Sequence, residues 1–222
     1  SYYHTIWENR TVSSINTTAD EITYLRGIDS IYSGFEIEGA YQPNKWVRFD
    51  LAASIADWTY TADVSSEVNN ISTGAVLPSS GTIYVKDLKV GDAPQTQFAY
   101  AVTVFPTRGL SVKLQGRSYA RYWSDYNAET RTSSADRGQP WQIPSYSIYD
   151  LHVTYHLPLD SSNYDISIFG HIFNLTDEVY VSDASDNSRF EAISSAPSHS
   201  AQRAEAFLGL PISYNLGVKV KF

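Results

Sequence analysis

Apolar and polar side chains alternate with a period of two along several long segments of the chain. In the last of these segments, one set of alternate positions holds Ile212, Tyr214, Leu216, Val218, Val220 and Phe222. The other set holds Ser213, Asn215, Gly217, Lys219 and Lys221. Successive side chains of a strand point to opposite faces, so this pattern predicts a β-strand with one unbroken apolar face.

The same alternation predicts about eight strands, each near or above the ~9–11 residues that a tilted membrane strand needs. The predicted strands are the opening segment SYYHTIWENRTV and residues 31–41, 47–55, 98–104, 110–122, 149–157, 164–173 and 212–222. Tight turns are expected at 42–45, 106–109 and 158–163, where Pro, Gly, Asn and Asp occur. Long polar loops are expected at 60–95, 124–143 and 182–208. Because short and long connections alternate, all three long loops should lie at one end of the strands.

Charged side chains and histidines share the polar face of most predicted strands. They are Glu36, Glu38, Arg48, Asp50, Lys113, Arg117, Arg121, Asp150, His152, His156 and His171. In a closed barrel these side chains would face the lumen. Aromatic residues near the predicted strand ends indicate interfacial girdles: Tyr41, Trp46, Tyr100, Tyr122, Tyr149, Tyr155, Tyr164 and Tyr214. The pattern therefore favours an antiparallel outer-membrane β-barrel over a soluble β-sandwich or small barrel, which also alternates.

Composition narrows the function classes. The 222 residues show no internal shift in composition, so one domain spanning 1–222 is expected, and 14% aromatic residues suit strands. A formal net charge of −8 argues against a nucleic-acid partner, and Cys 0 excludes disulfides and thiolate metal sites. No apolar run approaches the ~18 residues of a membrane helix, although barrel strands need no such run. The chain begins inside a predicted strand with no signal segment, so we expect a fragment of a longer protein.

Five segments, in order and spacing, resemble the C-terminal barrel region of TonB-dependent outer-membrane receptors. They are residues 34–58, 89–130, 143–158, 170–187 and 207–222. The fourth contains Asn174, Leu175, Asp177 and Tyr180, which are similar to the N-L-F-(D/N)-x-x-Y segment of that family. The wording HIFNLTDEVYVSDASDNS followed by FLGLP resembles receptors of Bacteroidetes-type bacteria.

The resemblance implies a 22-stranded barrel in a Gram-negative outer membrane, whose lumen is closed by an N-terminal plug. The chain would supply about eight C-terminal strands, with short periplasmic turns, long extracellular loops and no plug domain. The implied function is binding and TonB-dependent import of a scarce nutrient such as a ferric siderophore, cobalamin or an oligosaccharide. A passive pore or structural barrel is the alternative, and a soluble β-sheet adhesin or lectin is a further one.

The partners that the resemblance implies are outer-membrane lipid, the protein's own plug, the TonB complex through that plug, and a small-molecule or oligosaccharide ligand. The closing strand resembles the signal that the barrel assembly machinery reads. Its signal residues would be Tyr214, Leu216, Val218, Val220 and Phe222.

Candidate ligand contacts are the aromatic and arginine residues at outer strand ends and in the long loops. They are Trp58, Tyr60, Trp123, Tyr126, Arg131, Arg137, Trp141 and Arg189. Aromatic rings supply stacking area, and arginine binds carboxylates and phosphates. Interfacial anchoring is the competing interpretation of each.

No catalytic residue, metal or cofactor is predicted. A nucleophile-elbow G-x-S-x-G is absent from the sequence, so an enzyme is not expected. His152 and His156 lie four positions apart in one strand, roughly 13 Å at strand rise, which is too far for one ion. Hydrogen bonding within the lumen is the favoured interpretation of the histidines, including His171.

Overall fold

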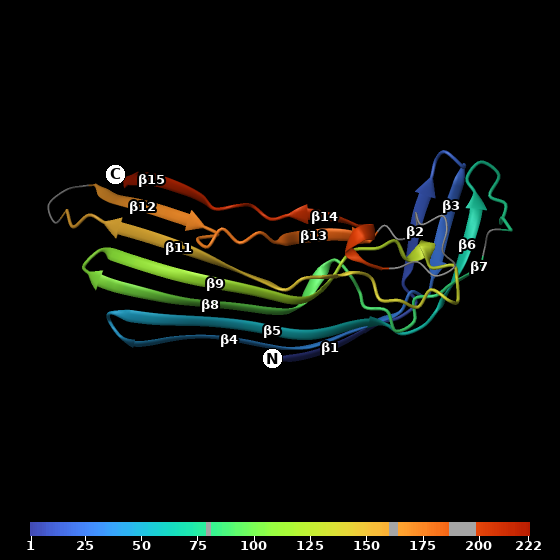
Figure 1. Ribbon diagram of the computed structural model, residues 1–222, viewed down its shortest axis with the longest axis horizontal. Helices are drawn as coiled ribbons and strands as arrows, with labels where there is room; N and C mark the ends of the chain where they lie inside the picture. The colour runs from blue at the N-terminus through green and yellow to red at the C-terminus, as the bar shows by residue number, and fades with distance from the viewer. Residues whose placement is uncertain (79–80, 160–163, 187–198) are drawn as a thin grey trace.

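The computed structural model describes residues 1–222 except 79–80, 160–163 and 187–198. Strands make up 64% of it, which confirms the predicted all-β class. The main sheet is antiparallel and contains β1 (Tyr2–Trp7), β4 (Ser30–Asn44), β5 (Val47–Tyr60), β8 (Ala93–Thr107), β9 (Leu110–Trp123), β11 (Tyr146–His156), β12 (Asp165–Phe173) and β15 (Ser213–Lys221), adjacent in that order, with β10 (Gln142–Ile143) paired to β9 (Figure 1). The eight strands of this path match the expected number.

The remaining strands form two smaller sheets at one end of the main sheet, opposite the tight turns (Figure 1). One sheet has the order β2 (Thr11–Asn16), β3 (Glu21–Arg26), β6 (Val64–Asn70) and β7 (Gly81–Ile83), and the other pairs β13 (Val181–Asp186) with β14 (Ala204–Leu208). Short 3-10 helices cover Ala128–Thr130 and Ala201–Arg203. Within the described residues, no helix is long and apolar enough to span a membrane.

The prediction of one strand over SYYHTIWENRTV is wrong, because two strands of different sheets occupy it. β1 ends at Trp7 and β2 begins at Thr11. Between them Asn9 takes the left-handed conformation, with φ 57°, and its backbone N–H donates to Asp29 Oδ1 at 2.6 Å. This turn separates the two strands, so the chain adds a fourth outer connection, residues 8–29, to the three that were expected.

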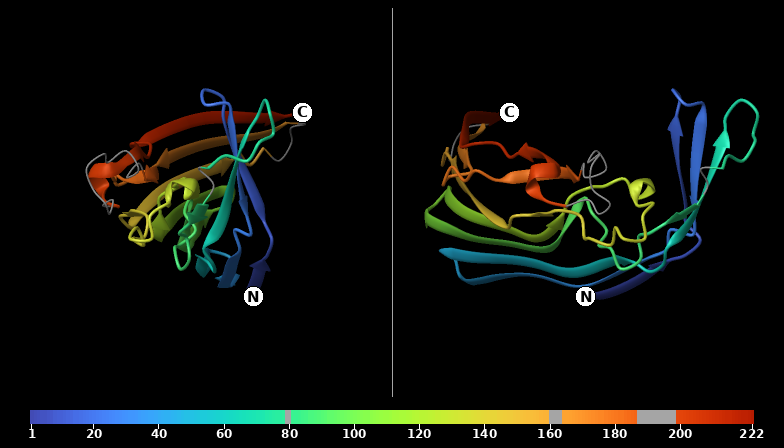
Figure 2. Two further views of the ribbon diagram at one scale, coloured as in Figure 1. Left: turned by 90° about the vertical axis from the view of Figure 1, so that its right-hand side faces the viewer. Right: turned by 45° about the vertical axis from the view of Figure 1, so that its right-hand side comes forward.

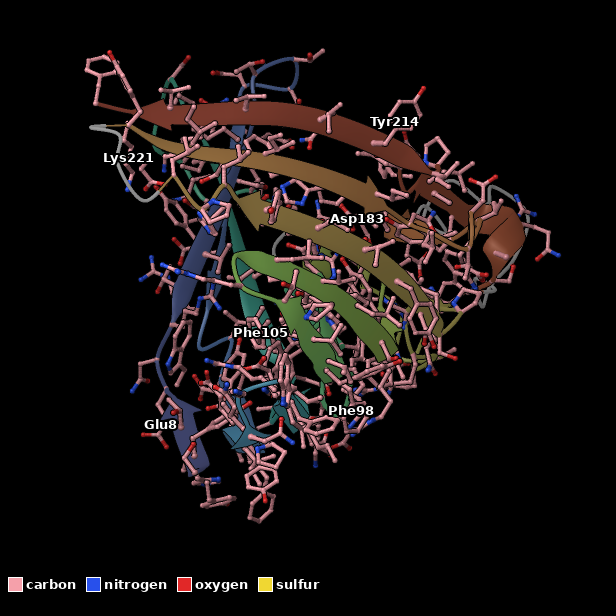
Figure 3. The ribbon with its side chains drawn as sticks, turned by 90° about the vertical axis from the view of Figure 1, so that its left-hand side faces the viewer. Glu8, Phe98, Phe105, Asp183, Tyr214 and Lys221 are labelled. Atoms are coloured by element: carbon pink, nitrogen blue, oxygen red, sulfur yellow. The ribbon has the colours of Figure 1, made fainter. Side chains whose placement is uncertain are left out.

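The main sheet is a curved, open wall. Figures 2 and 3 show it as an arc that runs from β1 to β15. Within the described residues, β1 and β15 are its two edges and do not pair with each other. The turn at 158–163 falls partly outside the described residues, whereas those at 42–45 and 106–109 connect neighbouring strands at the same end.

The strand register places the predicted polar residues other than Arg121 on one face of this wall. Arg121 lies outside the registered pairs and takes φ 52°. Lys113, His152 and His171 are directly opposite one another across β9, β11 and β12. Arg48 and Asp50, two positions apart on β5, form an ion pair of 2.7 Å. The next positions on β9, β11, β12 and β15 carry Leu114, Leu151, Ile172 and Tyr214. Because side chains alternate along a strand, one registered sheet separates the two kinds of side chain onto two faces.

The apolar face is uncovered. Tyr214 is 84% exposed and Leu216 is 80% exposed. Phe98 and Tyr214 project from the convex side of the arc, whereas Phe105 lies toward the concave side (Figure 3). The polar face is therefore the concave one.

The aromatic residues do not all follow the predicted girdles. Tyr100 lies in the middle of β8, where its ring covers Gly116 on β9. A Cβ at position 116 would lie 2.3 Å from that ring, so glycine is needed for this close approach. Trp46 lines a recess together with Ser111 and His156 of the polar face, and Tyr122 is only 8% exposed. Local alternation could not distinguish these positions from an interfacial belt.

The expected long polar loops fold into an ordered outer layer with its own apolar packing. One cluster of buried side chains contains Leu25, Ile28, Val64, Ile83, Val85 and Leu88. A second, of Tyr122, Ile143 and Ala184, packs β13 against β9 and β10 of the main sheet. Full burial of an aliphatic side chain stabilises a fold by about 1.5–3 kcal/mol. The name outer layer is used below for the described residues of four connections: 8–29, 61–92, 124–145 and 174–212.

Candidate functional site

A buried carboxylate on the polar face joins three segments near the outer layer. Asp150 on β11 has a side chain only 3% exposed, and its Oδ2 accepts a hydrogen bond from Arg117 Nη2 on β9 at 2.6 Å. Its Oδ1 accepts from the backbone N–H of Asn174 at 3.0 Å. A charged, hydrogen-bonded pair of this kind is stronger than a neutral one. Asp150 thus positions both a neighbouring strand and the segment that leaves β12.

The segment 174–180 forms a clasp around the side chain of Asn174. Its Oδ1 accepts from the Glu178 N–H at 2.9 Å, and its Nδ2 donates to the carbonyls of Glu178 and Leu210 at 2.9 and 3.1 Å. Asn174 takes φ 51°, a conformation that asparagine tolerates better than most residues. Asp177 Oδ1 accepts from the Ile212 N–H at 2.9 Å. Two polar residues of the family-like segment therefore hold the chain entering β15 against the end of β12.

This clasp also completes a row of three tyrosines. The Tyr119 and Tyr146 rings, paired across β9 and β11, have centroids 5.2 Å apart, and Tyr146 stacks on Tyr180 at 4.5 Å. Tyr119 and Tyr146 were not among the predicted ligand contacts. Alternation along β9 and β11 places both tyrosines on the polar face, but their contact with Tyr180 depends on how residues 174–180 fold.

A recess of about 520 Å³ lies on the polar face beside this row. Its lining residues include Glu36, Glu38, Ala52, Ser54, Gln97, Ala99, Arg117 and Tyr119. Two carboxylates come from β4, and a guanidinium and a phenol come from β9, with small side chains on the strands between them. The recess can therefore accept a group that carries both hydrogen-bond donors and acceptors.

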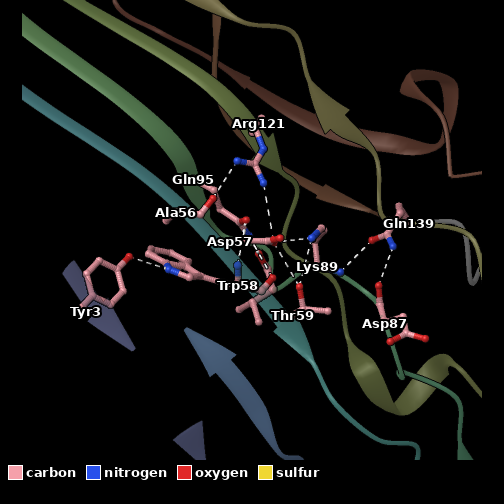
Figure 4. A network of polar contacts seen from close by, with 11 residues as sticks. Tyr3, Ala56, Asp57, Trp58, Thr59, Asp87, Lys89, Gln95, Arg121 and Gln139 are labelled. Carbon is pink, nitrogen blue, oxygen red and sulfur yellow. Dashed lines mark hydrogen bonds and ion pairs between the residues drawn. The ribbon is translucent and has the colours of Figure 1, made fainter. Parts of the chain in front are cut away.

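At the outer end of the wall, a polar network fixes the connection 61–92 to the sheet (Figure 4). Asp57 forms an ion pair with Lys89, and Arg121 Nη2 lies 3.7 Å from the same Asp57 oxygen. Arg121 Nη1 also donates to the Ala56 carbonyl at 2.8 Å. Trp58 Nε1 donates to Tyr3 Oη at 2.9 Å. Arg121 and Trp58 thus serve internal contacts at this rim.

Arg131, a predicted ligand contact, is 2% exposed and lies inside the outer layer. Its Nη1 lies 2.8 Å from Asp136 Oδ1 and 2.7 Å from His199 Nε2. His199 Nδ1 lies 2.6 Å from Asp186 Oδ2. Burial lowers the pKa of His199, but hydrogen bonds with Asp186 and Asp136 outweigh burial, and the pKa is raised above its ordinary value. Arg131 therefore joins two outer connections and presents no open guanidinium to a ligand.

Arg137 bridges the connection 124–145 to the connection 61–92. Its Nη1 and Nη2 donate to the two carboxylate oxygens of Asp63 at 2.6 and 2.7 Å. The Arg137 hydrogen bonds lower the pKa of Asp63 despite the opposing effect of burial. The Arg137 guanidinium also lies 4.8 Å from the Tyr84 ring centroid. Its side chain remains 41% exposed, so it can still reach solvent.

The other predicted ligand contacts are packed to different degrees. The Tyr60 and Tyr126 rings meet edge to face at 6.5 Å, and burial raises the pKa of Tyr126 well above its ordinary value. Trp123 is 8% exposed, and Trp141 packs on the cluster around Ile143. Arg189 lies outside the described residues.

The histidines of the polar face form two separate contacts. His152 Nδ1 lies 2.9 Å from His171 Nδ1, and His156 Nδ1 lies 2.8 Å from Ser167 Oγ. Across the part of the chain that the structure describes, no three or more His, Cys, Asp or Glu side chains are grouped so that they could hold a metal ion.

No family model and no curated protein matches the chain. Among solved structures, the ferric preacinetobactin receptor BauA from Acinetobacter baumannii aligns with a TM-score of 0.39 and 14% identity. The alignment covers 100% of this chain and 33% of the receptor chain, so the present chain spans about a third of that protein's length. A likeness of this degree assigns neither a family nor a ligand to the chain.

Proposed function

We propose that this chain is a wall segment of an outer-membrane receptor that binds a scarce nutrient and imports it by TonB-dependent transport. The nutrient class proposed is a ferric siderophore, cobalamin or an oligosaccharide. The segment would supply about eight of 22 strands and the outer connections that meet the ligand. Its partners would be lipid, the receptor's own plug, TonB through the plug, and the barrel assembly machinery through β15.

One observation carries the membrane part of this proposal: the chain separates its side chains onto two faces across the main sheet, and the apolar face is uncovered. Leu216 is 80% exposed and Tyr214 is 84% exposed on that face. The polar face is open as well, as at Arg48, whose side chain is 46% exposed. A soluble sandwich would cover the apolar face with a second layer. An apolar surface of this extent marks contact with lipid or protein.

The import part is supported by the family-like segments and by the position of the outer layer. The outer connections lie at one end of the wall, where a ligand arriving from outside would meet them first (Figure 1). The mechanism proposed is capture by this layer, closure over the ligand, and plug rearrangement when TonB pulls. No covalent reaction is involved.

Cysteine labelling tests which face of the main sheet contacts lipid, because the chain has no cysteine of its own. The full-length protein is expressed in a Gram-negative outer membrane, and the membranes are isolated without detergent. In these membranes Glu38→Cys and Lys113→Cys should react with a water-soluble maleimide. Ile37→Cys and Val112→Cys are matched neighbours that should react slowly. Equal labelling of neighbours would contradict the proposed lipid face.

Uptake measurements test the transport mode. A deletion mutant should lose growth on one iron, cobalamin or glycan source, and the full-length gene should restore it only in cells with functional TonB. Restoration without TonB would identify a passive pore, and a water-soluble, lipid-free monomer would identify an adhesin or lectin.

A further inference from the structure

The paired histidines His152 and His171 lie on the polar face and have no part in the proposed function. They are directly opposite each other on β11 and β12, and their Nδ1 atoms are 2.9 Å apart. In this structure the contact is a hydrogen bond between the two rings. The same geometry brings two metal-ligating nitrogens together from two adjacent strands.

We infer that His152 and His171 form a two-imidazole site for a divalent transition metal that prefers tetragonal or octahedral geometry, such as Cu²⁺ or Ni²⁺. An ion at the ~2.0–2.1 Å distance typical of imidazole ligands would bind two nitrogens 2.9 Å apart at an angle of about 90°. Tetrahedral Zn²⁺ would need these nitrogens about 3.3 Å apart. The bite therefore fits two neighbouring positions of a square-planar or octahedral ion.

The surrounding rings hold both imidazoles in place. Phe169 stacks on His171 with centroids 5.4 Å apart, and Phe173 lies 5.8 Å from His152 and 5.9 Å from His171. Ring orientation fixed before the metal arrives reduces the ordering that binding requires. Asn215 is directly opposite His171 on β15. Water would fill the other coordination positions on the concave side.

Charges around the pair act in both directions. Lys113 is directly opposite His152 on β9, and its cation disfavours a bound metal ion. Asp150, two residues before His152, is already paired with Arg117. Removal of the Lys113 charge should therefore strengthen metal binding. A histidine pair with a purely structural role would show no such increase.

The test uses the full-length protein purified in detergent and titrated with Cu²⁺ and Ni²⁺ alone. Wild type should bind one ion per chain at this site, and His152→Gln and His171→Gln should each weaken binding about tenfold or more. His156→Gln is the matched control, because His156 lies on the same strand and face and contacts Ser167 instead. It should bind as wild type does, whereas Lys113→Gln should bind more tightly.

Spectroscopy of the wild-type protein tests the same site if a substitution impairs folding. Electron paramagnetic resonance of the Cu²⁺ form should show hyperfine coupling to two imidazole nitrogens, and the Co²⁺ form should show the weak visible absorption of a six-coordinate ion. No stoichiometric binding, a loss of the same size in His156→Gln, or an intense tetrahedral Co²⁺ spectrum would each overturn it. None of these results depends on whether the protein transports a nutrient.

Discussion

The backbone N–H of Asn174 donates to Asp150 Oδ1 at 3.0 Å, so a carboxylate on β11 holds the segment that leaves β12. Arg117 occupies the other oxygen of the same carboxylate. Both contacts lie where the wall meets the outer layer, and substitutions here should separate wall stability from outer-layer order.

Asp150→Ala should destabilise the full-length protein by about 2–3 kcal/mol, because it leaves a buried N–H and part of a guanidinium without a partner. Asp150→Asn should cost less, since its amide oxygen can still accept from Asn174. The midpoint of urea unfolding in lipid vesicles measures both. Asp50→Asn, in the exposed ion pair with Arg48, is the control and should change little. Equal effects at positions 50 and 150 would refute the role given to Asp150.

Asn174→Ala should release the clasp, with a loss of about 2–3 kcal/mol from three hydrogen bonds and the strain of a left-handed alanine. Asn174→Gly loses the same hydrogen bonds without that strain, so it should be the milder change by about 1 kcal/mol. Protease cleavage within residues 174–180, followed over time, reports the release. Alanine and glycine variants cleaved at the same rate would show that the backbone conformation of Asn174 contributes nothing.

The joint of Arg131, Asp136, Asp186 and His199 should weaken as pH rises. The folded pKa of His199 is raised, so its contribution is complete below the ordinary value of 6.5 and is lost as pH passes through the raised value. Hydrogen exchange in residues 124–145 should therefore accelerate with pH beyond the intrinsic base-catalysed increase. His199→Gln should remove that excess, whereas His4→Gln, on β1, should retain it.

The Asp63–Arg137 contact should respond to pH in the opposite direction. The folded pKa of Asp63 is lowered, so its contribution is present above the ordinary value of 3.8 and is lost as pH falls through the lowered value. Acidification should loosen residues 61–63 and 137 together, as measured by hydrogen exchange. Arg137→Gln should show the loosened state already at neutral pH, and an unchanged pH response in that variant would contradict the assignment.

The period-two pattern was sufficient to predict the main sheet. Side-chain direction in a strand depends on the local backbone alone, so alternation was enough to predict the all-β class, the eight strands of the main path and the shared face of Lys113, His152 and His171. It predicted the first of these strands too long and missed the strands within the connections. Turn residues at 42–45 and 106–109 also predicted which connections are tight turns. The sequence also singled out the segment around Asn174, but it did not predict that this segment forms a clasp.

The contacts of the residues in the outer layer depend on how distant parts of the chain fold together. Arg131 and His199 lie 68 positions apart in the chain, and Arg137 and Asp63 lie 74 apart. No local pattern specifies such contacts, because they form only when separate connections fold onto one another. For the same reason, arginines that looked available for a ligand are engaged with carboxylates. The 2.9 Å approach of His152 and His171 likewise depends on the register of two strands, which alternation alone leaves open.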